Sequence, residues 1–346
     1  MNTTSGLMGA ASIASLLLMC TFASGGEPQD PTGGVTPPPS KHMIEAARRE
    51  GQVVWYTALE APLAASLAKD FEKRFGIRVN LVRGSSGEII ARVRAELAQP
   101  RIDVVQHYSE PEFIQLKEKG MLRDLTAIDT EAFRLRRGFV DPQKAFFAVD
   151  LEPIVLVYNT RLTKDRPTEW KDILSAKWMN NLAVISPRAE SGLVQAGFWA
   201  DNLGAGYLEA LAKRSPYVAK DASEVGESVA AGKRLAGIAT LDVALSLANK
   251  NVGYTIPTPG IPVMAGNVGV AKNAPHPGGG ALFAWYLGTR EAQSILVKGL
   301  RLPSRVDLDL GELSAFQSAN LYKPDWQKLS RERENLLKRW DDVIRW

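Results

Sequence analysis

The turn Gly84-Ser85-Ser86-Gly87 is the first group of residues with the means to bind a ligand, and it opens a predicted helix. A helix N-terminus offers unpaired N–H groups and about half a positive charge, so this turn could hold an anion. Either serine could instead serve only as the N-cap of the helix. Because the turn follows a predicted strand, it lies where open α/β sheets bind ligands, which favours the binding role.

Two further polar loops follow predicted strands at the same edge of the sheet. Thr57, Ala58 and Glu60 follow one strand, and Tyr108 and Glu110 follow another. Glu110 could ligate a metal or accept a hydrogen bond from an ammonium group. Alternatively, Glu110 is a carboxylate in the first turn of the next helix, where the helix dipole stabilises it. Glu60 is more typical of a surface acid or a helix start.

A second candidate anion site lies at residues 186–192, SPRAESG, which end one predicted strand and open a helix. Arg188 could contact an anion through two hydrogen bonds, with Ser191 beside it. A solvent-facing arginine next to a serine cap is the alternative. Thr240 and Asp242 follow another strand and are expected to face the same cleft, although Asp242 could be only a helix cap.

The residue types needed for enzyme catalysis form no recognisable motif. His42, His107 and His276 are the histidines of this chain, and none lies in a metal-binding spacing such as His-Glu-x-x-His. Neither a Gly-x-Ser-x-Gly elbow nor a phosphate-binding Gly-x-x-x-x-Gly-Lys sequence occurs. An enzyme that uses acids such as Glu110 and Asp242 is the alternative from another functional class. No cofactor is expected.

Alternating strand and helix patterns precede and separate these polar loops. Apolar residues four apart at Leu63, Leu67, Phe71 and Phe75 predict an amphipathic helix, and Gly76 is a C-cap that ends it. The alternation predicts a mostly parallel sheet covered by helices on both faces, which is an α/β fold. The expected strands are 53–56, 77–82 and 102–106, and the expected helices are 43–50, 61–75, 86–98 and 111–119.

A second domain is expected after a long extended run at 146–159, FFAVDLEPIVLVYN. Pro153 lies within this run, so the strand is predicted to bend or change sheet there. The three prolines of 255–265 predict a return crossing. Between the crossings we expect strands 182–186 and 235–239, helices at 190–203 and 206–214, and a further segment at 223–231. After the return we expect strand 268–273, a single helix over 278–298 and a helical tail to Trp346.

Length and charge limit the functional classes. A chain of 346 residues is expected to form two domains. Its net charge of +4 is mild, and no basic stripe with interleaved aromatic residues indicates a nucleic-acid surface. We therefore expect no nucleic acid among its partners, and a monomer.

The N-terminal segment has the features of an export signal. Residues 7–22 form an apolar stretch shorter than a membrane span, followed by small residues, which predicts a signal peptide over 1–24. Cys20 is the only cysteine and ends this run in a Leu-Leu-Met-Cys sequence typical of a lipoprotein processing site. Cleavage after Ala23 or Ser24, which would discard Cys20, is the alternative. Residues 25–42 are rich in proline and glycine and are predicted to form a linker.

The chain resembles the solute-binding proteins of bacterial ABC importers, in particular the cluster that includes ferric iron, thiamine and phosphonate binders. The resemblance rests on six segments in order: VVWYTALE at 53–60, FEKRFGIRVNLVRGSSGEIIARVRAE at 71–96, DVVQHYSE at 103–110, VLVYNT at 155–160, GNVGVAKNAPHPGGGALFAWYL at 266–287 and LPSR at 302–305.

The resemblance implies two α/β lobes joined by two crossing segments, the type II periplasmic binding protein fold, which closes on ligand by a hinge. It places lobe 1 at 43–153 plus 258–305, lobe 2 at 154–257 and C-terminal helices at 306–346. It implies a small-molecule ligand, an inner-membrane ABC permease as partner, and a periplasmic location, with a membrane tether if Cys20 is lipidated. A sensing role beside a membrane receptor shares this fold.

The resemblance leaves the ligand class open. Ferric members use a pair of adjacent tyrosines with a glutamate, and hard oxygen donors suit that cation. Glu110 matches the glutamate, but Asp242 and Val243 stand where the tyrosine pair would be. Iron held by Glu110, Asp242 and Glu60 with a synergistic anion is the alternative.

The leading expectation is a small anionic or zwitterionic ligand, such as a phosphonate, a sugar phosphate or a carboxylate. Its predicted contacts are Thr57, Ala58, Ser85, Ser86, Gly87, Tyr108, Glu110, Arg188, Ser191, Thr240 and Asp242.

Overall fold

The computed structural model describes residues 36–346 apart from 97–98, 205 and 345–346. The chain from Thr36 onward forms one compact unit. The predicted signal peptide, Cys20 and most of the predicted linker lie outside the described residues. Helix α1 (Lys41–Glu50) begins two residues earlier than expected, because Ser40 accepts a hydrogen bond from the N–H of Met43 and caps it.

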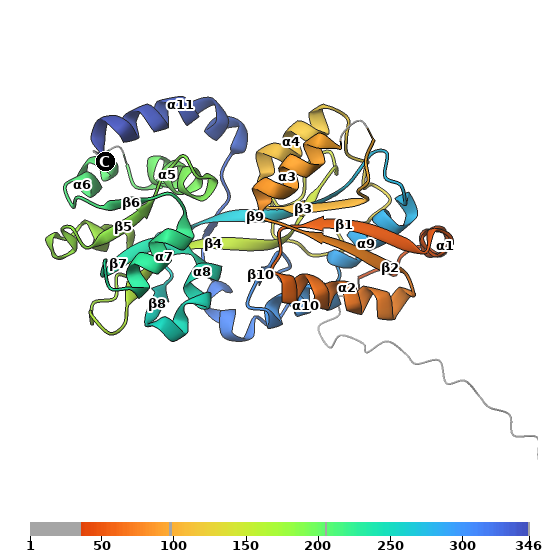
Figure 1. Cartoon of the computed structure of the whole chain (residues 1–346), viewed down its shortest axis with the longest axis horizontal. Helices are drawn as coiled ribbons and strands as arrows, with labels where there is room; N and C mark the ends of the chain where they lie inside the picture. Colours follow the sequence, from red (N-terminus) through yellow and green to blue (C-terminus); the bar gives the residue numbers. More distant parts are fainter. Residues whose placement is uncertain (1–35, 97–98, 205, 345–346) are drawn as a thin grey trace, which may run out of the picture. The chain divides into compact units, whose positions relative to one another are not determined.

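The first half of the sheet confirms the predicted alternation of strands and helices (Figure 1). Strand β1 pairs in parallel with both β2 and β3. In α2, Leu63, Leu67 and Phe71 face the core, and Gly76 ends the helix with φ +70°. The elements are β1 (Gln52–Thr57), α2 (Ala61–Phe75), β2 (Arg78–Arg83), α3 (Ser86–Ala95), β3 (Val104–His107) and α4 (Glu110–Glu118).

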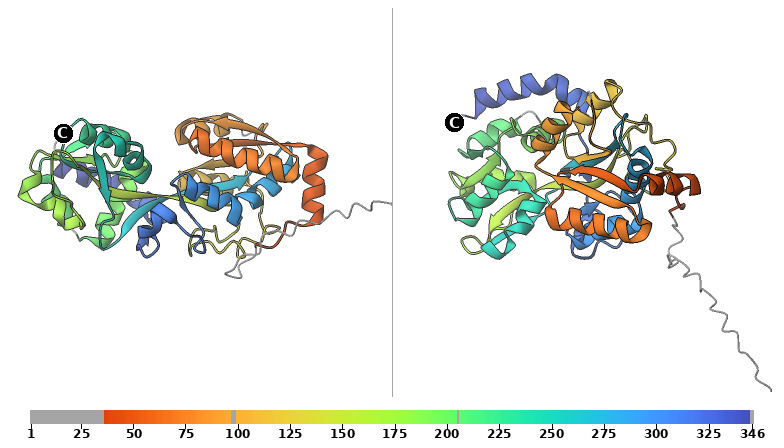
Figure 2. Two further views of the ribbon diagram at one scale, coloured as in Figure 1. Left: turned by 90° about the horizontal axis from the view of Figure 1, so that it is seen from below. Right: turned by 45° about the vertical axis from the view of Figure 1, so that its right-hand side comes forward.

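Two long strands, β4 (Phe147–Asn159) and β9 (Ile261–Val270), join the two halves of the sheet (Figures 1 and 2). Strand β4 pairs with β9 as far as Pro153 and with β7 from Ile154 onward. The predicted change of sheet at Pro153 is thus confirmed. The strand is not interrupted there, and the irregularity in its register lies between Ala148 and Asp150.

The second half of the sheet follows the same parallel plan, with β5 pairing in parallel with β6 and β7. The strand order is β2-β1-β3-β9-β4-β7-β5-β6, so β4 and β9 are central. The elements of this half are η1 (Trp170–Leu174), η2 (Ala176–Trp178), β5 (Leu182–Ile185), α5 (Glu190–Asn202), α6 (Tyr207–Ala212), β6 (Tyr217–Ala219), α7 (Ala222–Ala230), β7 (Ala236–Thr240), α8 (Leu241–Ser246), η3 (Ala248–Lys250) and β8 (Val252–Thr255).

Two expectations for the return of the chain were wrong in detail. The proline-rich crossing becomes strand at Ile261, because a proline near the start of a strand needs no ladder hydrogen bond. The helix expected over 278–298 is two helices, α9 (Pro277–Leu287) and α10 (Arg290–Lys298). Thr289 separates them, since its hydroxyl accepts from the N–H of Ala292 and starts a new helix. Strand β10 (Leu302–Pro303) then pairs with β4.

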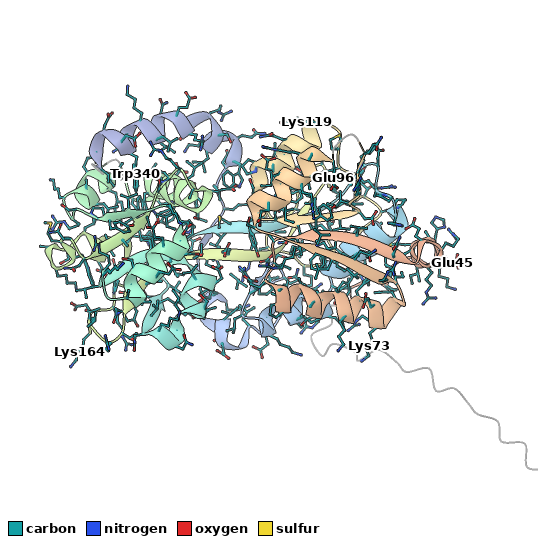
Figure 3. All side chains as sticks on the ribbon, viewed as in Figure 1. Glu45, Lys73, Glu96, Lys119, Lys164 and Trp340 are labelled. Atoms are coloured by element: carbon teal, nitrogen blue, oxygen red, sulfur yellow. The ribbon has the colours of Figure 1, made fainter. Side chains whose placement is uncertain are left out.

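The tail returns across the central strands before it reaches the second half of the sheet. It consists of η4 (Gly311–Phe316), β11 (Leu321–Tyr322), which pairs with β9, and α11 (Trp326–Val343). Helix α11 packs on α5 and α6, and Trp340 (Figure 3) stacks on Trp199 with ring centroids 6.3 Å apart. Across the described parts of the chain, none of the helices combines the length and apolarity that a membrane crossing needs.

Candidate functional site

A cavity of about 770 Å³ lies between helices α2 and α10 on one side and α7 and α8 on the other. This size is typical of a small-molecule site. Its lining combines charged groups and hydroxyls with apolar side chains. The charged and hydroxyl residues are Glu60, Ser66, Ser223, Asp242, Ser246, Lys298 and Arg301.

Arg301 is the centre of a charge cluster at this cavity. Its Nε lies 3.2 Å from Oε2 of Glu60, its Nη1 3.1 Å from Oε1 of Glu152, and its Nη2 3.9 Å from Oδ2 of Asp242. The arginine is 6% exposed. Burial disfavours its charge, but the surrounding Tyr108 and acids raise the pKa of Arg301 well above its usual value. The guanidinium is therefore permanently charged and fully engaged by carboxylates.

Tyr108 and Asp150 extend the cluster into the sheet. The Tyr108 hydroxyl donates to Oδ2 of Asp150 at 2.6 Å, and its ring centroid lies 5.3 Å from the Arg301 guanidinium. Burial raises the pKa of Asp150 to about 6, although Arg301 and the Tyr108 hydroxyl favour its ionised form. At neutral pH this carboxyl is ionised, and it adds a further negative charge beneath the cavity.

Glu152 and Asp242 are two acids that both approach the Arg301 guanidinium. Burial raises the pKa of Glu152 well above its usual value, and the neighbouring Asp242 raises it further. The pKa of Asp242 is lowered, because hydrogen bonding to Glu152 and the charge of Arg301 outweigh the effect of burial. The pKa values of the two neighbouring acids are thus moved in opposite directions, with that of Glu152 raised and that of Asp242 lowered.

Four members of this cluster were not among the predicted contacts of the leading ligand class: Asp150, Glu152, Arg301, and Glu60, which was named only as a ligand of the alternative iron site. Asp150 and Glu152 lie in the otherwise apolar run 146–159, at positions two apart on one face of β4. Two carboxylates inside a fully buried strand are unusual and were the available signal. Arg301 precedes the segment LPSR, and nothing in the sequence indicated that it reaches acids from three other elements.

The predicted contacts at the end of β1 are held by the neighbouring strand β3. The Thr57 hydroxyl donates to Oε1 of Gln106 at 2.5 Å, and the N–H of Ala58 donates to the same oxygen at 3.2 Å. Thr57 is fully buried. These contacts fix the loop that carries Glu60. A direct contact of Thr57 or Ala58 with ligand stays a prediction.

The glycine-serine turn begins α3 as a capping box. The Ser85 hydroxyl accepts from the N–H of Glu88, and the Glu88 carboxylate accepts from the N–H of Ser85. Ser86 Oγ accepts from the N–H of Tyr108 at 3.4 Å. A methyl group added at Gly87 would meet open space. The turn therefore has a structural role, and its ligand contacts stay predictions.

Glu110 lies in a second polar group, which involves the tail. Its Oε1 is 2.9 Å from Nζ of Lys323, and its Oε2 accepts from Nδ2 of Asn267 at 3.5 Å. Nearby, burial raises the pKa of Glu190 to about 7, and the neighbouring Ser109 opposes that rise. Glu110 thus has its own cation in this structure, and its role toward a ligand stays a prediction.

The remaining predicted contacts lie on α5 and α8. Arg188 makes a two-pronged ion pair with Asp341 of α11, at 2.9 and 3.1 Å. Ser191 lies in the first turn of α5, where it is partly buried. Thr240 is the N-cap residue of α8, where its side chain makes no capping hydrogen bond, and it lies two residues before Asp242. Asp242 is therefore the predicted contact that the structure brings to the cavity.

The oxygen ligands proposed for iron belong to separate groups. Glu110 pairs with Lys323, whereas Asp242 and Glu60 surround Arg301. In the described part of the chain, no three histidine, cysteine or acidic side chains are grouped so as to hold a metal ion. A metal held by Glu110 and Asp242 would need both sets of ion pairs to rearrange.

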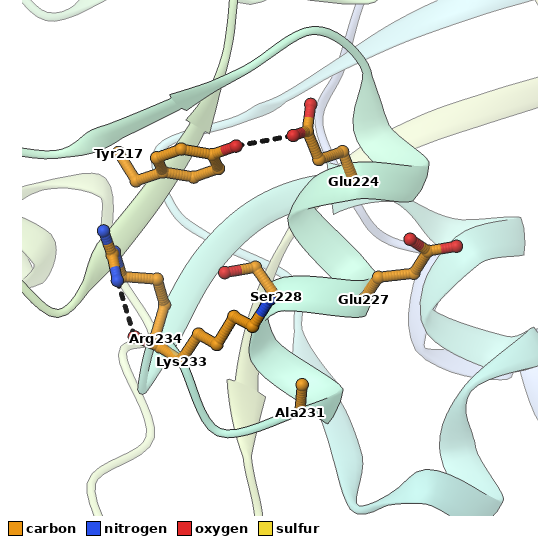
Figure 4. Close-up of a pocket in the computed structure, with 7 residues that line it drawn as sticks. All are labelled: Tyr217, Glu224, Glu227, Ser228, Ala231, Lys233 and Arg234. Carbon is orange, nitrogen blue, oxygen red and sulfur yellow. Dashed lines mark hydrogen bonds between the residues drawn. The ribbon is translucent and has the colours of Figure 1, made fainter.

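A second hollow of about 480 Å³ lies on the outer side of α7, lined by Tyr217, Glu224, Lys233 and Arg234 among others (Figure 4). The Tyr217 hydroxyl donates to Oε1 of Glu224 at 2.5 Å, and the Arg234 guanidinium lies 5.1 Å from the Tyr217 ring. Tyr217 and Glu224 thus satisfy each other, whereas Nε of Arg234 has no hydrogen-bond partner among the described residues. We take the cavity beside Arg301 as the candidate site.

Comparisons with known proteins agree on the fold. Residues 56–294 match the family described as bacterial extracellular solute-binding protein. A Salmonella paratyphi A protein named "Putative 2-aminoethylphosphonate-binding periplasmic protein" is 25% identical, over 79% of this chain and 85% of its own length. The structure of Trichodesmium IdiA (FutA) with iron and citrate superposes with a TM-score of 0.71 at 21% identity, over 85% of this chain and 99% of that one.

A third similar protein is AfuA of Actinobacillus pleuropneumoniae, solved with fructose-6-phosphate. It superposes with a TM-score of 0.66 at 22% identity, over 85% of this chain and 98% of that one. At these identities the two structures establish the two-lobed fold of periplasmic binding proteins and leave the ligand open.

Proposed function

Because this chain belongs to the family of bacterial extracellular solute-binding proteins, we propose that it captures a zwitterionic ligand that carries an amine and a phosphonate-type anion. The chain is the solute-binding component of an ABC importer, and its family implies a periplasmic location. Members of the family are binding proteins rather than enzymes. The proposal narrows the anionic or zwitterionic class expected from the sequence.

The observation that carries the proposal is that acidic side chains outnumber the arginine in the cluster beside the cavity. Four acids, Glu60, Asp150, Glu152 and Asp242, surround the one guanidinium of Arg301. A purely anionic ligand would be repelled by this group and would have to displace Glu60 or Glu152 from Arg301. A ligand ammonium, in contrast, compensates the excess negative charge.

The anionic end of the ligand would lie toward the other lining residues. Lys298 ends α10 at the cavity, and the hydroxyls of Ser66, Ser223 and Ser246 line it as well. The ammonium group of Lys298 and the hydroxyls of these serines can donate to phosphonate oxygens, which accept several hydrogen bonds. The cavity thus offers acids at one place and donors at another, as a zwitterion needs.

The similar Salmonella protein supports this ligand class, since its name refers to 2-aminoethylphosphonate, a zwitterion of this kind. Ferric iron with a synergistic anion is the second candidate, because the similar Trichodesmium structure holds iron and citrate and because Glu60 and Asp242 are hard oxygen donors. Tethering of the chain through a lipidated Cys20 is a separate proposal, which the mass of the membrane-extracted N-terminal peptide tests.

The experiment is native mass spectrometry of the protein purified from its own periplasm, with metal analysis of the same sample. A mass increment matching one small amine-containing phosphonate or related zwitterion, without iron, is the expected result. Stoichiometric iron would instead support the second candidate and overturn the first. The variant Asp242→Asn is expected to lose the increment, whereas Glu224→Gln at the outer hollow is expected to keep it.

A further inference from the structure

We propose that one end of the second half of the sheet is a docking surface for an anionic phospholipid bilayer. The surface, which we call the basic end, consists of five loops: 160–166, 177–181, 213–216, 231–235 and 247–251. None of the residues that line the cavity beside Arg301 lies in these loops, so the inference does not depend on the ligand. It adds to ligand capture a means of keeping the protein at the membrane across which the importer works.

Hydrogen bonds and side-chain contacts join the five loops into one surface. Leu162 lies 2.6 Å from the place that a Cβ at Gly232 would occupy, and Nζ of Lys177 lies 3.2 Å from Oδ1 of Asp165. Figure 3 shows Lys164 of this surface at the opposite end of the molecule from Glu45 of α1. Three backbone hydrogen bonds of 2.8–2.9 Å link further loops: Thr160 to Asn251, Asn180 to Arg214, and Leu235 to Asn181.

The basic end concentrates positive charge that the chain as a whole does not have. The five loops contain nine lysines and arginines and one acid, whereas the whole chain has a net charge of +4. Seven of the nine are exposed, Lys164 and Lys233 among them. The acid is Asp165, whose side chain and that of Lys177 are 56% and 45% exposed. Because the nine residues come from five loops, the folded chain gathers them without forming a basic run in the sequence.

This excess of positive charge favours an anionic partner. The acids of the adjoining helix α7 that line the outer hollow are Glu224 and Glu227, and they leave most of the nine cations uncompensated. Each lysine or arginine held near an anionic bilayer adds to the attraction, and the long side chains reach the lipid phosphates without a fixed geometry.

Exposed apolar side chains lie among these cations. Of the large hydrophobic side chains that are exposed in the described residues, Leu162, Met179 and Tyr217 lie in or next to the basic end, and Val306 lies elsewhere. Leu162 follows Arg161, and the guanidinium of Arg234 lies 5.1 Å from the Tyr217 ring. Single apolar side chains among cationic ones suit a fluid bilayer, which takes them up at the level of its headgroups, whereas a protein interface buries a continuous apolar core.

The test is sedimentation with phospholipid vesicles. It uses the chain from Thr36 onward, which forms one compact unit and lacks Cys20, so that no lipid anchor contributes. In about 0.1 M salt the protein is expected to bind vesicles of phosphatidylglycerol and phosphatidylethanolamine and to leave phosphatidylcholine vesicles unbound. Raising the salt to about 1 M should weaken the binding at least tenfold, because the screening length falls from about 10 Å to about 3 Å. A wild-type protein that stays in the supernatant with the anionic vesicles would overturn the inference.

Two double variants with the same change in charge separate this surface from the charge of the whole molecule. Lys164→Glu with Lys233→Glu is expected to weaken vesicle binding at least tenfold. The matched control is Lys73→Glu with Lys119→Glu, at exposed lysines of the first half of the sheet (Figure 3), and it should bind within about twofold of wild type. Thermal unfolding checks that both variants fold. Equal weakening in the two double variants would contradict a docking role for the basic end.

Soluble poly-L-glutamate distinguishes a lipid surface from an acidic protein as the partner. Leu162→Ser with Met179→Ser is expected to weaken vesicle binding at least threefold and to leave binding of poly-L-glutamate unchanged, because only the bilayer takes up the apolar side chains. Val306→Ser, at an exposed apolar side chain outside the basic end, should bind vesicles as wild type does. Binding of poly-L-glutamate by a protein that does not bind anionic vesicles would assign the surface to an acidic protein and overturn the proposal.

Discussion

Arg301 holds together acids from three different elements, and its removal is expected to be costly. Arg301→Met should lower the free energy of unfolding by about 3–5 kcal/mol, because buried carboxylates lose their compensating charge. Urea unfolding measures this. The matched control is Arg188→Met, since Arg188 and Asp341 form an ion pair with side chains 52% and 40% exposed. Such a pair is worth about 1 kcal/mol or less. Equal losses in the two variants would contradict the central role of Arg301.

Asp150 should give the protein a specific pH dependence. Its pKa is about 6 in the folded state against 3.8 ordinarily, so between these values the folded protein holds a proton that the unfolded chain has released. The free energy of unfolding should therefore fall as pH rises from about 4 to about 6, by up to about 3 kcal/mol from this group. Asp150→Asn is expected to lack this fall. Parallel unfolding profiles for the two proteins between pH 4 and 6 would contradict it.

At the scale of single residues, the sequence indicated part of the site. Tyr108 and Asp242 follow strands, where polar loops of a parallel sheet meet, and the structure brings both to the Arg301 cluster. Glu152 and Arg301 could not be found in this way, because their pairing joins positions 149 residues apart. Ser85 was predicted to contact the ligand, and the structure shows it as a helix cap. A helix cap and an anion site have the same sequence pattern, so the sequence alone could not separate them.

Strand β9 requires a glycine at position 266, where it lies against the buried Asp150 of β4. A methyl group at Gly266 would lie 2.0 Å from Oδ1 of Asp150, which is an overlap. Gly266→Ala is therefore expected to lower the free energy of unfolding by about 1–3 kcal/mol, as overpacked cores do. In Gly206→Ala the added methyl group meets nothing within 4 Å, and its effect should stay within about 0.5 kcal/mol. Thermal or urea unfolding of both variants measures these changes. A Gly266→Ala protein as stable as the Gly206→Ala control would contradict the packing described.

At the scale of elements, periodicity predicted most helices and strands. The amphipathic spacing of α2 and its terminal Gly76 defined both the helix and its end. The break between α9 and α10 was missed, because Thr289 is a cap only when the chain turns there. Strand β9 was also longer than expected, since pairing with β4 stabilises a segment whose prolines resemble a loop.

For the whole molecule, the account predicts closure of the lobes on ligand. Saturating 2-aminoethylphosphonate should reduce the radius of gyration in small-angle scattering, because a ligand that contacts both sides of the cavity favours the closed state. Asp242→Asn, which removes a cavity carboxylate on α8, should abolish the contraction at the same ligand concentration. Contraction of the variant equal to that of the wild type would show that the ligand closes the lobes from elsewhere.

The sequence also predicted the two-lobed organisation, through Pro153 and the proline-rich return. It did not predict that the tail crosses back. Strand β11 pairs with β9, and Lys323 reaches Glu110 on the first half of the sheet. A helical, charged tail has no pattern that names its partner, so this contact needed the folded structure.

The most direct measurement compares the binding of 2-aminoethylphosphonate with that of ethylphosphonate, which lacks the amine, by calorimetry on ligand-free protein. The account predicts that the amine-bearing compound binds at least tenfold more tightly, because its ammonium meets the carboxylates of Glu60 and Asp242. Asp242→Asn should remove most of that preference. Equal affinity for the two compounds, or binding of ferric citrate alone, would contradict the central claim that the acids of this cavity select a cationic group.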